Sequence, residues 1–141
     1  MTLLDLYQYA EDQKIEVDAF PVGSRGAMSL QDAEGGCHIA IDPHRVESTA
    51  DEKTKLGHEL GHCMTGAFYN TQSSADTRRQ QENRAEKWEI RNLISEKALQ
   101  EAVAAGKTDV WELAEYFEVT EELMKKAICL YQRGNLAIEM Y

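Results

Sequence analysis

The clearest repeat of apolar positions along the chain involves Leu56, Leu60 and Cys63, which recur at intervals of four and three residues. This spacing places the three side chains on one face of a helix, where they would be buried. Thr49 opens the pattern of a capping box, because a glutamate follows three residues later, and Gly66 is a suitable helix stop. We therefore predict a helix that begins near residue 50, capped by Thr49, and ends at Gly66.

The N-terminal third of the chain has shorter patterns. Residues 2–13 repeat apolar side chains at helical spacing, and residues 15–17 alternate as a short strand does. Two further apolar runs, residues 28–30 and 37–41, flank the glycine-containing stretch 32–36, which is typical of a β-hairpin. In the second strand of this hairpin the odd-numbered side chains would face the core.

The C-terminal half is predicted to be helical. Residues 75–105 have the periodicity of one long helix, and residues 110–117 and 121–131 resemble a helix-turn-helix pair in which Thr120 caps the second helix. Residues 136–141 form an apolar tail that we expect to pack against the rest of the chain. Together the patterns predict an α+β fold, with a small three-stranded, mainly antiparallel sheet packed on the helix described first, followed by a helical half.

A length of 141 residues suits one domain with a single core. We expect residues 1–68 to form the sheet and its helix, and residues 75–141 to form a helical subregion of the same domain. No segment approaches 18 consecutive apolar residues, and no basic stretch at the N-terminus leads into an apolar run. These features predict a cytoplasmic protein without a membrane segment, and they leave the oligomeric state open.

The three cysteines, Cys37, Cys63 and Cys129, are scattered and form no C-x-x-C pair. Each falls on a predicted apolar face. An odd count without metal-ligand spacing favours three buried thiols over a redox or metal role.

Acidic side chains outnumber basic ones by 25 to 15, which gives a formal net charge of −10. Contacts to phosphates need clustered Lys and Arg, so this balance argues against direct nucleic-acid binding. The helix-turn-helix-like pair itself has more Glu than Lys, and we interpret it as a packing or protein-recognition element. The same negative field could steer a basic protein substrate towards the chain.

The motif that carries the most chemistry is the H-E-x-x-H sequence of residues 58–62. On a helix, His58 and His62 lie one above the other, nearly opposite the apolar stripe. Neutral imidazole nitrogens bind Zn²⁺ at about 2.0–2.1 Å, so the pair can share one ion. A structural or surface pair is the alternative, but two imidazoles that face away from the core need another partner. Glu59 points to a different side of the helix, so it would lie beside the metal rather than bind it.

A catalytic zinc site typically has three protein ligands and one open position, so a third ligand must come from elsewhere. Glu82, Glu86 and Glu89 cluster on one side of the helix predicted over residues 75–105. One of these carboxylates could bind the metal while another orients an imidazole N–H. Spacing alone does not decide between this interpretation and ordinary solvated glutamates, even for Glu82.

The motif of residues 58–62, followed by E-x-x-A-E-x-W at residues 82–88, resembles the gluzincin peptidases and more closely the ImmA/IrrE family of bacterial and phage metallopeptidases. The resemblance implies that His58, His62 and Glu82 hold Zn²⁺ and that Glu59 is the general base. The bound metal would lower the pKa of its water to about 7 and polarise a peptide carbonyl. Two positions depart from the family pattern, Arg84, where an acid is often expected, and Glu89, where alanine is common.

The residue that would stabilise the oxyanion is not determined by the sequence. The candidates are Tyr69, His38, His44 and Arg78. By the same resemblance, the strand just before the metal-binding helix would lie beside the cleft and pair with an extended substrate.

Two functions from different classes fit these features. The first is a zinc-dependent endopeptidase; the resemblance implies a phage- or mobile-element-type transcriptional repressor, such as a helix-turn-helix protein, as its substrate. The second is a non-catalytic, zinc-containing regulatory protein that acts by binding a protein partner. An intact Glu59 favours the first, because a purely structural site needs no base beside its ligands.

Overall fold

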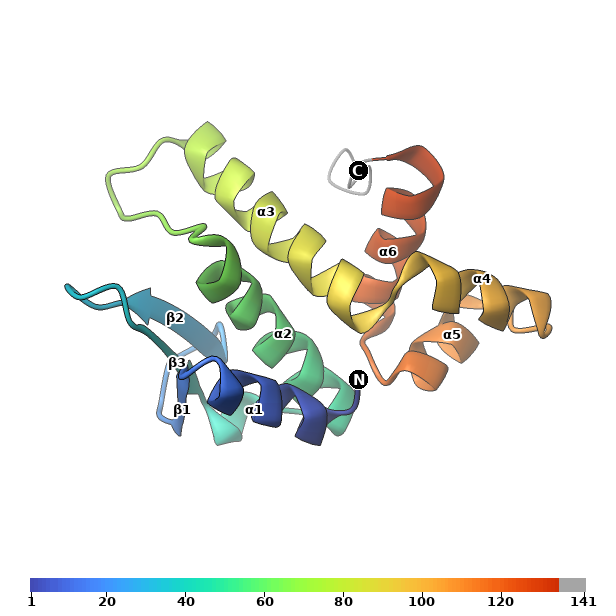
Figure 1. Ribbon diagram of the computed structural model, residues 1–141, viewed down its shortest axis with the longest axis horizontal. Coiled ribbons are helices and arrows are strands. Elements are labelled where there is room, and N and C mark those ends of the chain that lie inside the picture. Colours follow the sequence, from blue (N-terminus) through green and yellow to red (C-terminus); the bar gives the residue numbers. More distant parts are fainter. Residues whose placement is uncertain (135–141) are drawn as a thin grey trace.

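The computed structural model describes residues 1–134 and confirms the α+β class. The predicted apolar tail, residues 136–141, lies outside the described residues. Figure 1 shows the sheet and α1 on one side of α2, with α3 alongside α2 and the last three helices at the far end of α3. The elements, in chain order, are α1 (Leu3–Asp12), β1 (Glu16–Ala19), β2 (Ala27–Gln31), β3 (Cys37–Ile41), the short 3₁₀ helix η1 (Pro43–Arg45), α2 (Thr49–Thr65), α3 (Ala75–Leu93), α4 (Glu96–Ala104), α5 (Val110–Phe117) and α6 (Glu121–Arg133).

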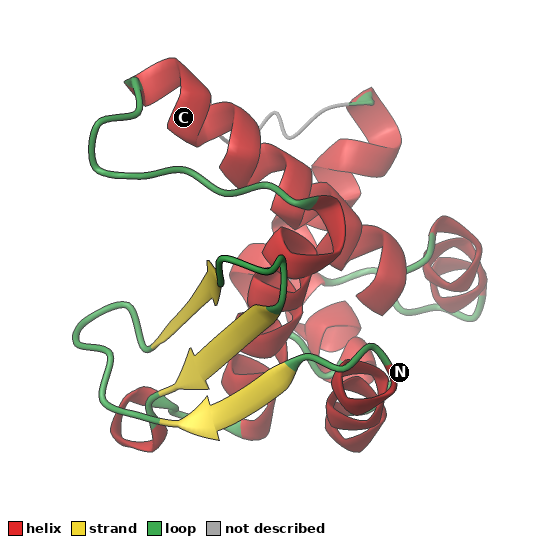
Figure 2. Cartoon of the chain, turned by 60° about the vertical axis from the view of Figure 1, so that its left-hand side comes forward, coloured by secondary structure: helices red, strands yellow, loops and turns green. Residues whose placement is uncertain are grey.

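The three strands form one mixed sheet in the order β1-β3-β2 (Figure 2). β2 and β3 pair antiparallel, with Ser29 opposite Ile39, so the predicted hairpin is present. β1 pairs parallel to β3, with Val17 opposite Ile39, so only one of the two pairings is antiparallel. β3 therefore occupies the centre and has a strand on each side. The expectation that the strand before α2 would pair with a substrate is wrong, because β2 rather than β3 has the free edge beside α2.

α2 begins one residue earlier than the capping-box pattern predicts. Ser48 is the N-cap, and its side chain accepts a hydrogen bond from the backbone N–H of Asp51 at 3.0 Å. Thr49 is instead the first helical residue. At the other end the prediction is correct, because Gly66 ends α2 in the left-handed region with φ of 67°. The predicted apolar stripe is buried where Leu56 and Leu60 lie, and both are fully inaccessible.

α2 and α3 pack with their backbones in close contact. A Cβ atom added at Gly61 would overlap the backbone carbonyl of Ala85, lying 2.9 Å from its carbonyl carbon. At Gly57 an added Cβ would instead meet the Cδ1 atom of Leu93 at 2.8 Å. Only glycine at position 61 lets the two helices approach this closely.

The prediction of a single helix over residues 75–105 is wrong, because this stretch forms two helices. The C-cap of α3 is Ile94, whose φ of −136° and ψ of 83° lie outside the helical region. Ser95 then caps α4, accepting a hydrogen bond from the backbone N–H of Ala98 at 3.2 Å. A serine inside a helical pattern is a start signal that periodicity alone does not register. Within residues 1–134, no helix is both long and apolar enough to span a bilayer.

The predicted helix-turn-helix-like pair is α5 and α6, with Thr120 as the N-cap of α6. Polar contacts fix this pair to α2. The buried Lys53 donates from Nζ to the carbonyl of Phe117 at 2.6 Å, and the Thr120 N–H donates to Thr54 Oγ1 at 3.1 Å. Apolar side chains of α6, such as Met124, complete the core. Within the chain, the pair is a packing element.

A disulfide joins Cys37 in β3 to Cys63 in α2, while Cys129 is free. The prediction of three free thiols is therefore wrong for two of them. The alternation that turns Cys37 towards the core and the helical stripe that contains Cys63 both direct these side chains to the same interface. The bridge ties the sheet to α2 one residue beyond His62.

We predict that Gly61→Ala lowers the free energy of unfolding, although glycine-to-alanine changes in helix interiors usually raise it by about 1 kcal/mol. The added methyl group would meet the Ala85 backbone, which cannot rotate away, so a loss of about 1–3 kcal/mol is expected. Gly57→Ala is the matched control. Its methyl group meets side-chain atoms only, Leu93 Cδ1 at 2.8 Å and Glu89 Cγ at 3.2 Å, so the loss should be smaller than for Gly61→Ala. Urea denaturation measures both, and a Gly61→Ala protein as stable as wild type would contradict the backbone contact.

Reduction of the disulfide should destabilise the fold. The bridge closes a loop with a sequence separation of 26 residues, for which the loss of unfolded-state entropy corresponds to about 3 kcal/mol. Cys37→Ser should show this loss in urea denaturation without any reductant. Cys129→Ser is the control and should unfold as wild type does, and equal stability of all three proteins would argue against the bridge.

Candidate metal centre

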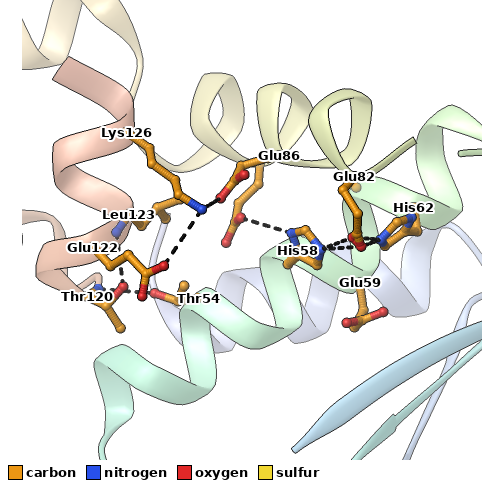
Figure 3. Close-up of polar contacts among 12 residues, drawn as sticks. Thr54, His58, Glu59, His62, Glu82, Glu86, Thr120, Glu122, Leu123 and Lys126 are labelled. Carbon is orange, nitrogen blue, oxygen red and sulfur yellow. Dashed lines mark hydrogen bonds and ion pairs between the residues drawn. The ribbon is translucent and has the colours of Figure 1, made fainter. Parts of the chain in front are cut away.

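Three side chains that are distant in sequence converge between α2 and α3 (Figure 3). His58 and His62 lie one turn apart on α2, with ring centroids 4.9 Å from each other. Glu82 extends from α3 towards both rings. Its carboxylate oxygens lie 3.2 and 3.4 Å from His58 Nε2, and 3.0 and 3.3 Å from His62 Nε2. The structure thus brings together the three residues that the sequence and its resemblance single out.

These separations suit a shared metal ion. Ligand atoms about 2.0–2.1 Å from a tetrahedral zinc ion are about 3.3 Å from one another. The nitrogen-to-oxygen distances of 3.0–3.4 Å match this spacing, and all three ligand atoms lie within 4.8 Å of one another. Two neutral imidazoles and a carboxylate are also donors that zinc prefers.

The outer nitrogen of each ring has its own acceptor, which orients the ring. After Gly66 turns the chain back, the carbonyl of Ala67 accepts a hydrogen bond from His62 Nδ1. His58 Nδ1 faces Glu89 Oε1 at 3.6 Å. With each Nδ1 directed at an acceptor, both Nε2 atoms are left for a metal, which is the usual arrangement around metal-binding histidines.

A second group of side chains, His58 with Glu86 and Glu89, also has metal-ligand spacing. It includes only one of the two histidines. Glu86 is already paired with Lys126 of α6, its Oε1 lying 2.9 Å from the ammonium nitrogen (Figure 3). A cation therefore already neutralises Glu86, and the geometry favours the group that contains Glu82.

The charges in this centre are strongly coupled. Burial lowers the pKa of His58, but hydrogen bonds and charges from Glu82 and Glu89 outweigh it and raise the pKa to about 11. Burial raises the pKa of Glu82, but the two histidines outweigh it and hold the pKa well below its usual range. Burial raises the pKa of Glu89 to about 7, and its Oε2 atom has no hydrogen-bond partner among the described residues. The cluster thus stabilises one positive charge at His58, and metal binding there would displace a proton.

Glu59 projects from the other side of α2, towards the sheet (Figure 3). Only 5% of it is exposed, and Ser29 of β2 donates a hydrogen bond from Oγ to Glu59 Oε1 at 2.7 Å. Glu59 and His62 line the same cavity, which has a volume of about 440 Å³. Met28 and Ser29 of the edge strand β2 therefore border the same cleft as Glu59 and His62, one of the three candidate ligands.

The four candidate oxyanion-stabilising residues divide into two groups. Tyr69 and Arg78 both line this cleft, and the Tyr69 hydroxyl lies 3.4 Å from Glu82 Oε1. His38 and His44 do not line it. His38 lies on the sheet, where its ring nitrogens contact Asp32 at 2.9 Å and Glu16 at 3.2 Å. Hydrogen bonding to Asp32 raises the pKa of His38, which accounts for this histidine without a role in the cleft.

Comparison with known families shows which family the chain belongs to. The family model described as the IrrE N-terminal-like domain of the peptidase M78 family matches residues 10–128. The chain belongs to this family. The resemblance to ImmA/IrrE is thereby confirmed, and M78 membership makes the chain a member of a peptidase family with a metallopeptidase-type motif. Comparisons with curated proteins and with solved structures gave no significant match.

The sequence alone missed three contributors to this candidate site. Ser29 holds Glu59, the Ala67 carbonyl holds His62, and Arg25 lines the cleft. Ser29 had a weak signal, because it is a polar residue on the inward-facing side of a strand. The other two had none, since a backbone carbonyl has no sequence signature and Arg25 lies in a connecting loop.

Arg84, a departure from the family pattern, has a structural explanation. Its guanidinium donates from Nη2 to the carbonyl of Thr65 at 2.8 Å, in the last turn of α2. A cation at a helix C-terminus satisfies a free carbonyl and interacts favourably with the helix dipole. Arg84 therefore helps to fix α3 against the end of the helix that carries both histidines.

We predict that Glu82→Ala weakens zinc affinity by more than about 100-fold, because removal of an outer hydrogen-bond partner alone costs about 10–100-fold. His58→Ala should do the same. Glu86→Ala, one turn further along α3, is the matched control and should stay within a few-fold of wild type. Competition with a chromogenic chelator measures all three, and wild-type affinity in Glu82→Ala would remove Glu82 from the ligand set.

Proposed function

We propose that the protein is a zinc-dependent endopeptidase in which His58, His62 and Glu82 hold the metal and Glu59 is the general base. The observation that carries this proposal is the convergence of the three candidate ligands beside a cleft that also contains a buried carboxylate. Membership in a peptidase family supports the reaction class. Zinc is preferred from the donor set of two imidazoles and one carboxylate.

When bound, zinc would supply a Lewis acid that activates water and polarises the peptide carbonyl. Glu59 takes the proton from the attacking water and passes it to the amine of the leaving fragment. The Ser29 hydroxyl holds one Glu59 oxygen at 2.7 Å and leaves the other free for this proton. Because Glu59 is almost fully buried, bulk water has little access to the carboxylate between the two transfers.

Stabilisation of the oxyanion falls to the two candidates that line the cleft. Tyr69 is better placed than Arg78, because its hydroxyl lies close to the candidate ligand Glu82. Arg78 instead donates from Nη2 to the carbonyl of Thr71 at 2.8 Å, and its guanidinium carbon lies 5.9 Å from the centre of the Tyr69 ring. We assign Tyr69 the contact with the oxyanion and Arg78 the support of the loop that carries Tyr69.

The substrate that we propose is a transcriptional repressor of the phage or mobile-element type, cleaved at one peptide bond. This substrate follows from the ImmA/IrrE resemblance, and the acidic net charge of −10 favours encounter with a basic, DNA-binding protein. The same proposal places the activity in the cytoplasm, where such a repressor acts. In a reducing compartment the Cys37–Cys63 pair would be present as two thiols.

Glu59→Gln is the test of the proposed chemistry. The amide cannot accept the proton, so repressor cleavage should fall by a factor of about 10²–10⁴. Zinc content should be unchanged, because Glu59 is not among the candidate ligands. The measurement combines metal analysis with co-expression of a candidate repressor beside the wild-type or variant protein, followed by detection of repressor fragments.

Three outcomes separate the possibilities. Fragments that appear with wild type and disappear with Glu59→Gln would support a peptidase. Equal loss of repressor function with both proteins, without fragments, would point to a regulatory protein that acts by binding. Loss of zinc from Glu59→Gln would contradict the assignment of Glu59 as a base beside the metal.

A further inference from the structure

The cleft beside Glu59 has a charge opposite to that of the chain as a whole. Acidic residues outnumber basic ones by ten in the sequence. Among the charged residues that line this cleft, however, Arg25 and Arg78 are basic and only Glu59 is acidic. Glu59 lies at the buried end and is held by Ser29, so the accessible charge of the cleft is positive.

Arg25 is the more informative of the two arginines. It lies in the loop before β2 and is exposed, and its side chain has no hydrogen bond or ion pair within residues 1–134. It also lines the adjoining cavity of about 240 Å³, where Lys55 and Lys126 face Glu86, Glu89 and Glu122, so Arg25 stands where a cavity of mixed charge meets the cleft at Glu59. A guanidinium in this position is available to a bound peptide.

Arg78 has a different role, because its hydrogen-bonding capacity is partly used. Its contact with Thr71 fixes the loop, and its guanidinium lies over the Tyr69 ring, where it lines the cleft. A ligand in the cleft would therefore meet one unpaired arginine and one anchored arginine. Guanidinium groups are matched to carboxylates in both charge and shape.

We propose that the cleft selects substrates with an acidic side chain near the scissile bond, and that Arg25 is the residue that recognises it. This inference rests on the proposed function and narrows its substrate class. Arg25 and Glu59 line the same cleft, so a peptide bound there beside the free edge of β2 could present an acidic side chain to Arg25 while its scissile bond lies by Glu59. The negative field of the whole chain acts at longer range and does not oppose a contact made inside the cleft.

The test measures binding rather than turnover. Peptide hydroxamates, which chelate zinc, would be made in matched forms that differ only in a Glu, Gln or Lys residue before or after the chelating group. Isothermal titration with the zinc-loaded wild-type protein should show the Glu peptide bound about tenfold more tightly than the Gln peptide, as expected for one charge-assisted hydrogen bond. The Lys peptide should bind most weakly.

Charge reversal distinguishes recognition from a structural effect. Arg25→Glu should invert the order, so that the Lys peptide binds more tightly than the Glu peptide. Arg79→Glu is the matched control, because Arg79 is exposed on α3, pairs with Asp76 and does not line the cleft. It changes the net charge equally and should keep the wild-type order.

Each outcome decides the proposal. Equal affinities for the three peptides, or an order that Arg25→Glu leaves unchanged, would overturn the role of Arg25 while leaving the peptidase proposal intact. Inversion by Arg79→Glu as well would show that net charge, not Arg25, sets the preference. Failure of every hydroxamate to bind would contradict the metal centre itself, and the specificity proposal with it.

Discussion

The candidate metal centre depends on the contact between the backbones of α2 and α3. Helices usually pack with axes about 8–10 Å apart, at a distance set by the side chains between them. Here Gly61 has no side chain, and the Ala85 carbonyl occupies the space beside it. His58 and His62 flank this point on α2, and Glu82 lies one turn before it on α3. A larger side chain at position 61 would move the carboxylate away from both imidazoles together, so one glycine controls the distances between Glu82 and the two histidines.

The same contact creates a buried group of charges that must balance. Ionised side chains away from water are costly unless they are paired. Glu82 lies against both histidines, and the buried Glu89 lies behind His58. Without a metal, a proton on His58 provides the positive charge, which is why its pKa is raised to about 11. A divalent cation could replace that proton without rearrangement of the carboxylates. Glu89, whose pKa burial raises to about 7, lies behind the ring that the metal would share.

Much of this arrangement could be predicted from the sequence. Most of the features that could not be predicted depend on contacts between segments far apart in the chain. The spacing of residues 58–62 and the apolar stripe predicted which face of α2 is buried and which face carries the candidate metal ligands, and the structure agrees. Local signals also gave the hairpin and the Thr120 cap. One failure is local, because the cap at Ser95 that divides α3 from α4 leaves the periodicity unchanged. The others concern tertiary partners: the parallel β1–β3 pairing, the Cys37–Cys63 bridge and the hydrogen bond from Ser29 to Glu59. Periodicity shows which face of an element is buried, but not which distant side chain that face meets.

The acidic C-terminal pair of helices affects the site through one contact that also limits its chemistry. Glu86 is the neighbour of Glu82 on the same face of α3 and would compete with it for a cation. The ammonium group of Lys126 in α6 forms an ion pair with Glu86 Oε1 at 2.9 Å. Glu122 Oε1 lies 3.8 Å from the same ammonium group. Because α5 and α6 are fixed to α2 through Lys53 and Thr54, this ammonium group is held in place by the fold. The helix-turn-helix-like pair thus serves to neutralise one carboxylate and leave the other for the metal.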